Sequence, residues 1–154
     1  IVAAAPAYLA RLPVPIHPAE LASHDCIVRR AEQTGRLRPW TLTNGSGEQT
    51  STTPKPRILL SDADAVCRAA LLGLGVALIP MPYALPQLRS GTLVRSLPDW
   101  YADTGPVAIY FLQSRLLPAK TRACVDFIAT AFRRDKLAEP LLATAPRRDH
   151  TGSG

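Results

Sequence analysis

Apolar residues recur at helical spacing in the stretch from Ser61 to Pro80. Positions i, i+3, i+4, i+7, i+8 and i+11 are occupied by Ala63, Val66, Cys67, Ala70, Leu71 and Leu74. This spacing predicts a helix with one buried face. Ser61 is placed to cap its N-terminus and Asp64 to act as the capping-box acid. Gly73 and Gly75 are expected to end the helix.

Short apolar runs on both sides of this helix predict strands at 57–60 and 76–79, the second ended by Pro80. A strand–helix–strand unit implies a parallel sheet that is covered by helices. Ligands of such sheets bind beyond the carboxyl ends of the strands, where helix N-termini direct free N–H groups outward. Ser61 lies at such a place. The pattern leaves open whether Ser61 only caps the helix or also contacts a ligand.

The rest of the chain predicts further short elements of an α/β domain. The dipeptide Asn44-Gly45 is typical of a tight turn, and the stretch 46–56 is typical of a surface loop or edge segment. Another loop is expected at 98–105. Strands are expected at 1–5, 26–29, 40–43, 92–97 and 107–112. Helices are expected to begin at Pro6, Pro18, Met81 and Pro118, and the last of them places Cys124, Phe127, Ile128 and Ala131 on one face.

Composition indicates a globular chain, because 47% of its 154 residues are hydrophobic and 19% are charged. No run approaches the ~18 apolar residues of a membrane span, and no secretory leader is visible. The sequence begins with Ile1 rather than Met. We therefore interpret it as a piece of a longer protein.

The basic residues are dispersed, although the formal net charge is +6. Without a basic stripe interleaved with aromatic residues, the pattern does not favour direct nucleic-acid contact by this segment. Cys26, Cys67 and Cys124 are scattered and lack CxxC spacing. They are interpreted as small buried hydrophobic residues of a protein in a reducing compartment.

The sequence contains no convincing catalytic or metal-binding motif. His24, Asp25 and Cys26 are adjacent, and neighbouring residues of an extended strand point to opposite faces, so they cannot form a nucleophile–base pair. A capping or loop role is expected for His24. Asp62 and Asp64 fit solvated acids of a first helical turn better than metal ligands. No enzyme activity, cofactor or metal is expected.

Six segments follow one another in a recognisable order: VAAAPAYLA, PAELASHDCI, PWTL, SDADAVCRAALLGLGVALIP, LRSGTLVRSLPD and PVAIYFLQSRLLPAKTRACVDFI. In this order the chain resembles, from Val2 to Phe132, the C-terminal part of the effector-binding domain of LysR-type transcriptional regulators. Each segment alone is weakly specific, and their order and spacing carry the resemblance.

The resemblance implies an α/β fold, a Rossmann-like subdomain of the periplasmic-binding-protein type 2 class. Residues 1–97 would form the second subdomain, and 104–134 the strand and helix that return to an incomplete first subdomain, together a partial effector-binding domain over 1–134. Residues 135–154 are expected to be a disordered tail. Because the strand and helix would lack much of their sheet, we expect this chain alone to be poorly stable, to aggregate or to self-associate.

The resemblance also implies a function: a small-molecule effector binds in the cleft between two subdomains and changes DNA binding by a helix-turn-helix domain that is absent from this chain. The full-length protein would be a cytoplasmic homo-oligomer without a membrane segment. The implied effector-binding residues are Ser61 and Asp62, with Pro6 and Pro80 as further positions. The alternatives are an extracytoplasmic solute-binding protein of a transporter, a small enzyme on a Rossmann-like scaffold and an inactive fragment.

Overall fold

The computed structural model describes residues 1–31, 35–103 and 119–134. These residues fall into two units, which are treated separately. One unit contains Ile1–Asp103, and the other spans Thr104–Thr144 and contains helix α4 (Ala119–Arg134).

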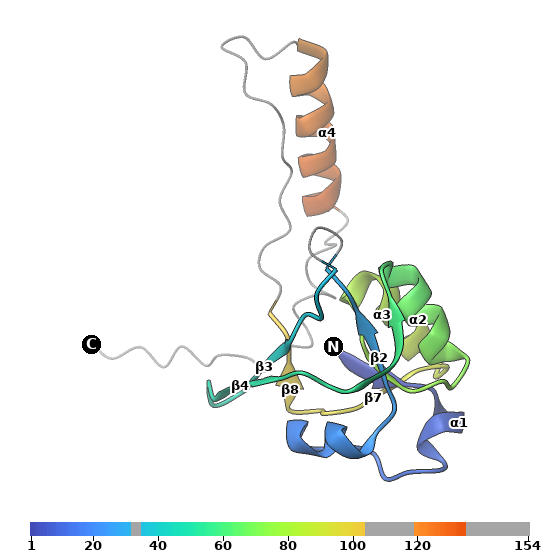
Figure 1. The fold of residues 1–154 in the computed structure, drawn as a ribbon. Helices are drawn as coiled ribbons and strands as arrows, with labels where there is room; N and C mark the ends of the chain where they lie inside the picture. Colours follow the sequence, from blue (N-terminus) through green and yellow to red (C-terminus); the bar gives the residue numbers. More distant parts are fainter. Residues whose placement is uncertain (32–34, 104–118, 135–154) are drawn as a thin grey trace. The chain divides into compact units, whose positions relative to one another are not determined.

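The larger unit is built on a five-stranded sheet with the strand order β5-β2-β6-β1-β7. Figure 1 labels its strands β2 and β7. Strand β2 pairs in parallel with both β5 and β6, whereas β1 runs antiparallel to β6 and to β7. The expected strand–helix–strand unit is present, with β2 inserted between its two strands. The sheet is mixed, so the expectation of a parallel sheet is wrong. The strands are β1 (Val2–Ala4), β2 (Cys26–Arg29), β5 (Pro56–Leu60), β6 (Val76–Leu78) and β7 (Val94–Arg95).

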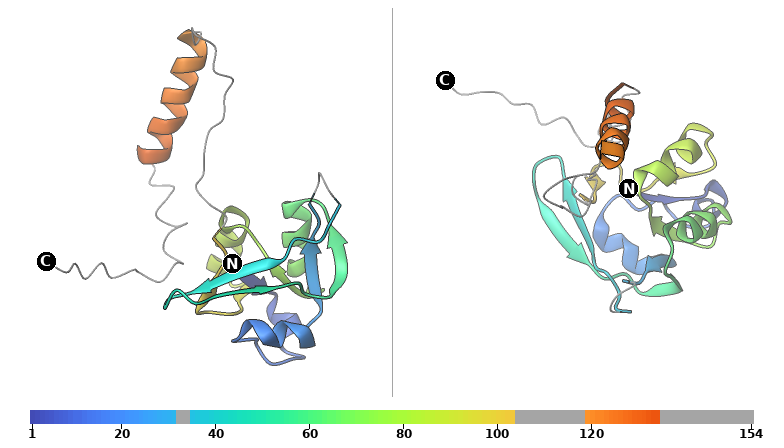
Figure 2. Two further views of the ribbon diagram at one scale, coloured as in Figure 1. Left: turned by 60° about the vertical axis from the view of Figure 1, so that its left-hand side comes forward. Right: turned by 90° about the horizontal axis from the view of Figure 1, so that it is seen from above.

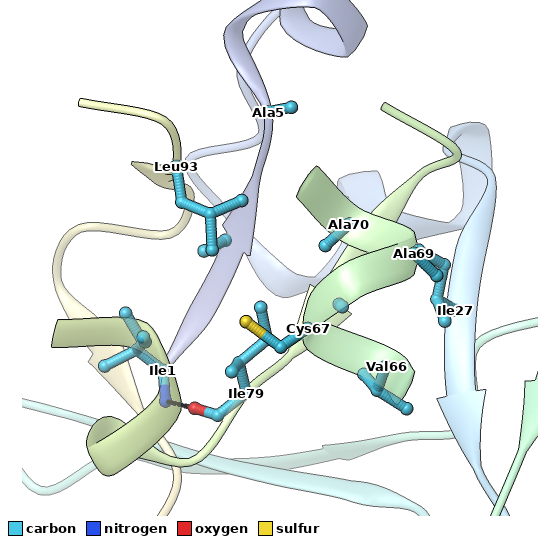
Figure 3. Packing of buried hydrophobic residues seen from close by; sticks show 12 residues of the cluster. Ile1, Ala5, Ile27, Val66, Cys67, Ala69, Ala70, Ile79 and Leu93 are labelled. Atoms are coloured by element: carbon cyan, nitrogen blue, oxygen red, sulfur yellow. Dashed lines mark hydrogen bonds between the residues drawn. The ribbon is translucent and has the colours of Figure 1, made fainter. Parts of the chain in front are cut away.

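Alternate residues of the strands enter two separate cores, as the period of two in a strand requires. Ala3, Ile27 and Ala77 share one core with residues of the helices α2 and α3. Figure 3 shows Ile27 beside Ala69 of α2. Val2 and Val28 face the opposite side, in a core with Tyr8, Leu42 and Trp100 among others. Seen from above, the helices α2 and α3 and the β3–β4 hairpin lie on opposite sides of the sheet (Figure 2). The helices of this unit are α1 (Pro6–Leu9), the 3-10 helix η1 (Pro18–Ser23), α2 (Ala63–Leu71) and α3 (Met81–Arg89).

A second, three-stranded antiparallel sheet has the order β4-β3-β8, with β3 (Trp40–Asn44), β4 (Gln49–Thr52) and β8 (Trp100–Tyr101). The Asn44 side chain holds the predicted turn, because its Oδ1 accepts hydrogen bonds from the backbone N–H groups of Ser46 and Glu48. The edge segment expected in 46–56 is confirmed as β4. The loop expected at 98–105 is partly wrong, because β8 pairs there with β3.

Helix α2 begins one residue later than predicted. Its N-cap is Asp62, whose carboxylate accepts a hydrogen bond of 2.8 Å from the Ala65 N–H, so the prediction of Ser61 as N-cap is wrong. Serine and aspartate cap equally well, so the local pattern could not choose between them. Asp64 does not close a capping box but forms an ion pair with Arg68 at 2.7 Å. The helix ends before Leu74, which is 43% exposed rather than buried as predicted.

The predicted last helix is confirmed as α4. No residue of α4 is buried. Phe127 is 71% exposed and Cys124 is also exposed, because the described part of this unit offers no sheet for that face. The expectation of a buried Cys124 is therefore wrong, whereas Cys26 and Cys67 are buried as predicted. The strand expected at 107–112 and the tail 135–154 lie outside the described residues. No helix in the described ranges is long and apolar enough to span a membrane.

Candidate functional site

The carboxyl ends of β2, β5 and β6 meet at one edge of the five-stranded sheet, because these three strands are parallel. Arg29 is the last residue of β2 and Arg30 follows it, and Ser61 and Asp62 follow β5. Pro80 follows β6 by two residues. We call these five residues the carboxyl edge. The Arg30 N–H donates a 2.9 Å hydrogen bond to the carbonyl of Leu60, which ties the ends of β2 and β5 together.

Pro6 lies at the opposite edge of the sheet. It follows β1, which runs antiparallel to β6 with Val2 opposite Leu78. The start of β1 is therefore the end that lies beside the end of β6, and Ile1 and Ile79 exchange backbone hydrogen bonds of 2.9 and 2.8 Å there. Figure 3 shows Ile1 bonded to Ile79, with Ala5 at the far end of the strand. Strand direction thus separates Pro6 from Ser61 and Pro80.

Ser61 and Asp62 lie side by side and differ in what their side chains do. Both are exposed. The Asp62 carboxylate caps α2, whereas the Ser61 hydroxyl makes no hydrogen bond within the part of the chain that the structure describes. The Ser61 hydroxyl is therefore available to a ligand. The sequence left open whether Ser61 only caps the helix or also contacts a ligand. The capping role belongs to Asp62, so only the contact with a ligand stays open for Ser61.

Pro80 is the N-cap residue of α3 and offers a ligand only its ring. As a proline it has no N–H group. Its carbonyl oxygen already accepts hydrogen bonds from the N–H groups of Tyr83 and Ala84, at 3.0 and 3.1 Å. The residue is half-buried. Pro80 can therefore shape a binding site and contributes little to its polarity.

The connections that leave β2 and β6 take opposite sides of the sheet. After β2 the chain passes to the β3–β4 hairpin, on the side of Val28, and after β6 it passes to α3, on the side of Ile79. Such a reversal between neighbouring parallel strands is a topological switch point, where open α/β sheets bind their ligands. Arg29 and Arg30 flank it. Sequence reasoning singled out neither of them, although the predicted strand at 26–29 ends on Arg29 and Arg30 is the next residue.

The His24–Cys26 run lies at the amino ends of the parallel strands and has a structural role. The Tyr8 hydroxyl lies 3.3 Å from His24 Nδ1 and accepts a 2.9 Å hydrogen bond from the Asp25 N–H. His24 is the C-cap of η1, as its expected capping role requires. Burial raises the pKa of Cys26 to about 12 and lowers the pKa of His24. A thiol with such a pKa stays protonated near neutral pH and is a poor nucleophile.

A metal centre finds no support in the described residues. Within residues 1–31, 35–103 and 119–134, no group of three or more His, Cys, Asp or Glu side chains is placed to hold an ion. Asp62 and Asp64 serve a helix cap and an ion pair instead. These contacts agree with the interpretation of both as acids of a first helical turn.

The sheet, its switch point and the polar residues beside it define an α/β ligand-binding subdomain. Comparison with known proteins identifies the family of this subdomain: residues 1–133 match the family model described as the LysR substrate binding domain. The chain belongs to this family and is an effector-sensing domain of the LysR type. The expected resemblance and the periplasmic-binding-protein type 2 fold class are both confirmed.

The similar proteins are transcriptional regulators. The HTH-type transcriptional activator TtdR of Escherichia coli K12 is 34% identical over 140 residues, which cover 91% of this chain and 44% of TtdR. The HTH-type transcriptional regulator PtxR of Pseudomonas aeruginosa is 30% identical, with 88% and 42% covered. The chain therefore spans less than half of these relatives.

A solved structure shows the same fold. The regulatory domain of AphB from Vibrio vulnificus, treated with cumene hydroperoxide, superposes with a TM-score of 0.70 at 32% identity. The match covers 84% of this chain and 64% of that domain. Because the similar proteins are regulators, the solute-binding alternative is not favoured.

Proposed function

We propose that this chain binds a small metabolite at its carboxyl edge and thereby controls transcription as part of a LysR-type regulator. The observation that carries the proposal is the family match over residues 1–133. The larger unit of the structure has a topological switch point at the carboxyl edge, which supports the proposed location of the site. The relatives TtdR and PtxR are named as HTH-type regulators. A cytoplasmic location follows from a role in transcription.

The Ser61 hydroxyl is proposed as a hydrogen-bonding group for the effector, and Pro80 as a wall of the site. Asp62 is proposed to lie at the mouth of the effector-binding site, where its carboxylate caps α2. Pro6 is left out, because strand direction puts it at the other edge of the sheet. No cofactor or catalytic step is part of the proposed mechanism.

The effector is proposed to bridge two subdomains. Residues 1–97 form the second subdomain in this scheme, and 104–134 belong to the first, whose remaining part lies outside the 154 residues. An effector that binds one closure better than another shifts the population towards it. In a homo-oligomer this shift repositions the helix-turn-helix domains, which alone contact DNA.

A metabolite screen on the full-length protein tests the proposal. A ligand present at about one hundred times its dissociation constant stabilises the native state by about 2.7 kcal/mol, which is detected as a rise in Tm. Ser61→Ala should weaken the binding of the ligand by about three- to tenfold, the usual value of one hydrogen bond. Ser51→Ala is the matched control, because Ser51 is exposed on β4. Unchanged affinity in Ser61→Ala would remove Ser61 from the site.

A second readout tests the regulatory role. The same ligand should change the affinity of the full-length protein for its operator DNA, because the coupling between two sites is reciprocal. A ligand that binds the carboxyl edge without any effect on DNA binding would contradict the proposed role in transcription and leave a solute-binding role.

A further inference from the structure

A histidine stands at each end of the 3-10 helix η1. His17 is its N-cap residue and His24 is its C-cap residue. Between them, Leu21 is 1% exposed and belongs to the core that also contains Trp100. The helix therefore covers part of this core. Because a short 3-10 helix has poor hydrogen-bond geometry of its own, the contacts at its ends matter for its position.

At the C-terminal end of η1, His24 accepts a hydrogen bond from Tyr8. The Tyr8 hydroxyl oxygen already accepts a 2.9 Å hydrogen bond from the Asp25 N–H, which leaves its own hydrogen to donate. His24 Nδ1 lies 3.3 Å from this oxygen. Tyr8 is buried, so water is a poor substitute as acceptor. The contact is complete only when Nδ1 of His24 carries no proton.

At the N-terminal end of η1, His17 uses the same ring nitrogen. Its Nδ1 accepts a 3.3 Å hydrogen bond from the Ala19 N–H in the first turn of the helix. Both ring nitrogens of a protonated imidazole are donors, so protonation breaks this contact as it breaks the contact of His24. Each end of η1 is thus held by a histidine that must be neutral.

Charged groups from several elements surround His24. Burial lowers the pKa of His24, and Glu20 of η1 and Asp25 oppose this shift in part. Asp25 is itself paired with Arg57 of β5 at 3.2 Å. The other titratable groups beside it are Tyr8, Arg11 and Cys26. Because burial outweighs the two acids, the native state favours the neutral ring.

The surroundings of His17 are aromatic and polar. Its ring meets Trp100 of β8 in a T-shaped arrangement, with 5.5 Å between the ring centroids. The Arg95 guanidinium donates a 3.3 Å hydrogen bond to the Trp100 carbonyl, and Asp99 precedes Trp100 in the chain. The Glu20 carboxylate accepts a backbone hydrogen bond at the same end of η1. Strand β4, which also packs against η1, has no charged residue. Neither of the two ion pairs among the described residues holds a protonated histidine in place.

We propose that His17 and His24 form a proton-sensitive clamp, which holds η1 against the larger unit while both rings are neutral and releases it when they are protonated. Protonation of His24 deprives the buried Tyr8 hydroxyl of its acceptor, and a buried polar group without a partner is unfavourable. Protonation of His17 adds a smaller effect, because Ala19 is exposed.

The direction of the pH dependence follows from the contact of His24. The docked helix binds a proton at His24 less readily than the released helix does, because burial lowers the pKa of this ring. Docking is therefore complete above about pH 6.5, the ordinary pKa of histidine, and is lost as the pH falls from there towards the lowered pKa. The clamp does not involve a ligand at the carboxyl edge, since His24 precedes β2 at the opposite end of this strand.

Amide hydrogen exchange of the full-length protein at about pH 7.5 and about pH 5.5 tests the inference, with rates corrected for the intrinsic effect of pH on exchange. The amides of residues 19–25 should lose protection by about three- to tenfold at the lower pH, the usual value of one hydrogen bond. The amides of β6 should stay more protected than those of η1 at both pH values, because only a larger opening exposes them. Equal protection of η1 and β6 would mean that η1 leaves only when the unit unfolds, and would overturn the inference.

His17→Asn/His24→Asn separates the clamp from other effects of acid. The asparagine Oδ1 takes the place of Nδ1 as an acceptor and does not titrate. This variant should keep η1 protected at the higher pH and lose most of the fall in protection at the lower pH. Tyr8→Phe removes the donor instead, and should leave η1 poorly protected at both pH values. If the asparagine pair does not fold, the wild-type profile and Tyr8→Phe decide the question.

Glu20→Gln is the matched control, because it removes a titratable side chain from the same helix and leaves both imidazole rings in place. It should keep the fall in protection. The inference is overturned by protection of residues 19–25 that does not depend on pH, by full pH dependence in the asparagine pair, by wild-type protection in Tyr8→Phe, or by loss of the pH dependence in Glu20→Gln.

Discussion

Gly75 approaches the backbone of Asp25 so closely that a Cβ atom at position 75 would lie 2.4 Å from the Asp25 carbonyl oxygen. That carbonyl also accepts a 2.8 Å hydrogen bond from the Val76 N–H, which fixes the start of β6 beside β2. Only glycine fits here without a backbone shift. The close approach therefore positions the two strands whose ends form the switch point.

Gly75→Ala should lower the free energy of unfolding by about 3 kcal/mol, because the new methyl group meets rigid backbone rather than a flexible side chain. Urea unfolding followed by circular dichroism measures the effect. Gly91→Ala is the control: Gly91 also has a positive φ, and a Cβ atom at position 91 would meet nothing within 4 Å. It should cost only about 1–2 kcal/mol of backbone strain. Equal costs for the two variants would contradict the close approach.

Asp62→Ala should lower the free energy of unfolding by about 1 kcal/mol, because it removes the hydrogen bond to the Ala65 N–H. Ser61→Ala should change it by less than about 0.5 kcal/mol, since its hydroxyl has no partner in the described part of the chain. Denaturant titration of both variants gives the comparison. A larger loss in Ser61→Ala than in Asp62→Ala would restore Ser61 as the cap.

Stability should fall as the pH drops below about 6.5, the ordinary pKa of histidine. Burial lowers the pKa of His24 in the native state, and Glu20 and Asp25 oppose this shift in part. The unfolded chain therefore binds a proton more readily, so stability is complete above that pH and is lost towards the lowered pKa. The unfolding free energy of His24→Gln should depend less on pH between about pH 7.5 and about pH 5.5. An unaltered pH dependence would show that His24 does not contribute.

The chain of residues 1–154 should self-associate as its concentration rises. Phe127 and Ile128 are 71% and 43% exposed on α4, and burial of each is worth about 1.5–3 kcal/mol. Phe127→Ser/Ile128→Ser should shift sedimentation towards the monomer. Leu72→Ser, at a residue that is 76% exposed beside α2, is the control and should have no such effect. A wild-type chain that stays monomeric and melts cooperatively would contradict the prediction.

Local patterns predicted most elements and could not predict how the strands pair. The strand at 26–29 and the turn at Asn44 follow from short apolar runs and turn residues, and the structure places both as predicted. The antiparallel direction of β1 and the two-residue strand β8 depend on partners far along the chain. Pairing over such distances leaves little trace in a local pattern.

The candidate site shows the same division. The expectation for Ser61 follows from its place after a predicted strand, and the expectations for Asp62, Pro80 and Pro6 follow from the family resemblance. Strand direction places Pro6 apart from the other three. The position of β2 between the parallel strands β5 and β6, and with it the placement of Arg29 and Arg30 beside the switch point, appears only once the order of strands is known.

Amide hydrogen exchange of the full-length protein, with and without a ligand from the metabolite screen, tests the central claim most directly. An effector bound at the carboxyl edge should protect amides at residues 29–31, 61–65 and 81–84, and Ser61→Ala should reduce this protection at a given ligand concentration. The amides beside Pro6 and Gly73, at the opposite edge, should exchange as before. Protection confined to that opposite edge would contradict the claim that this domain senses its effector where β2, β5 and β6 end.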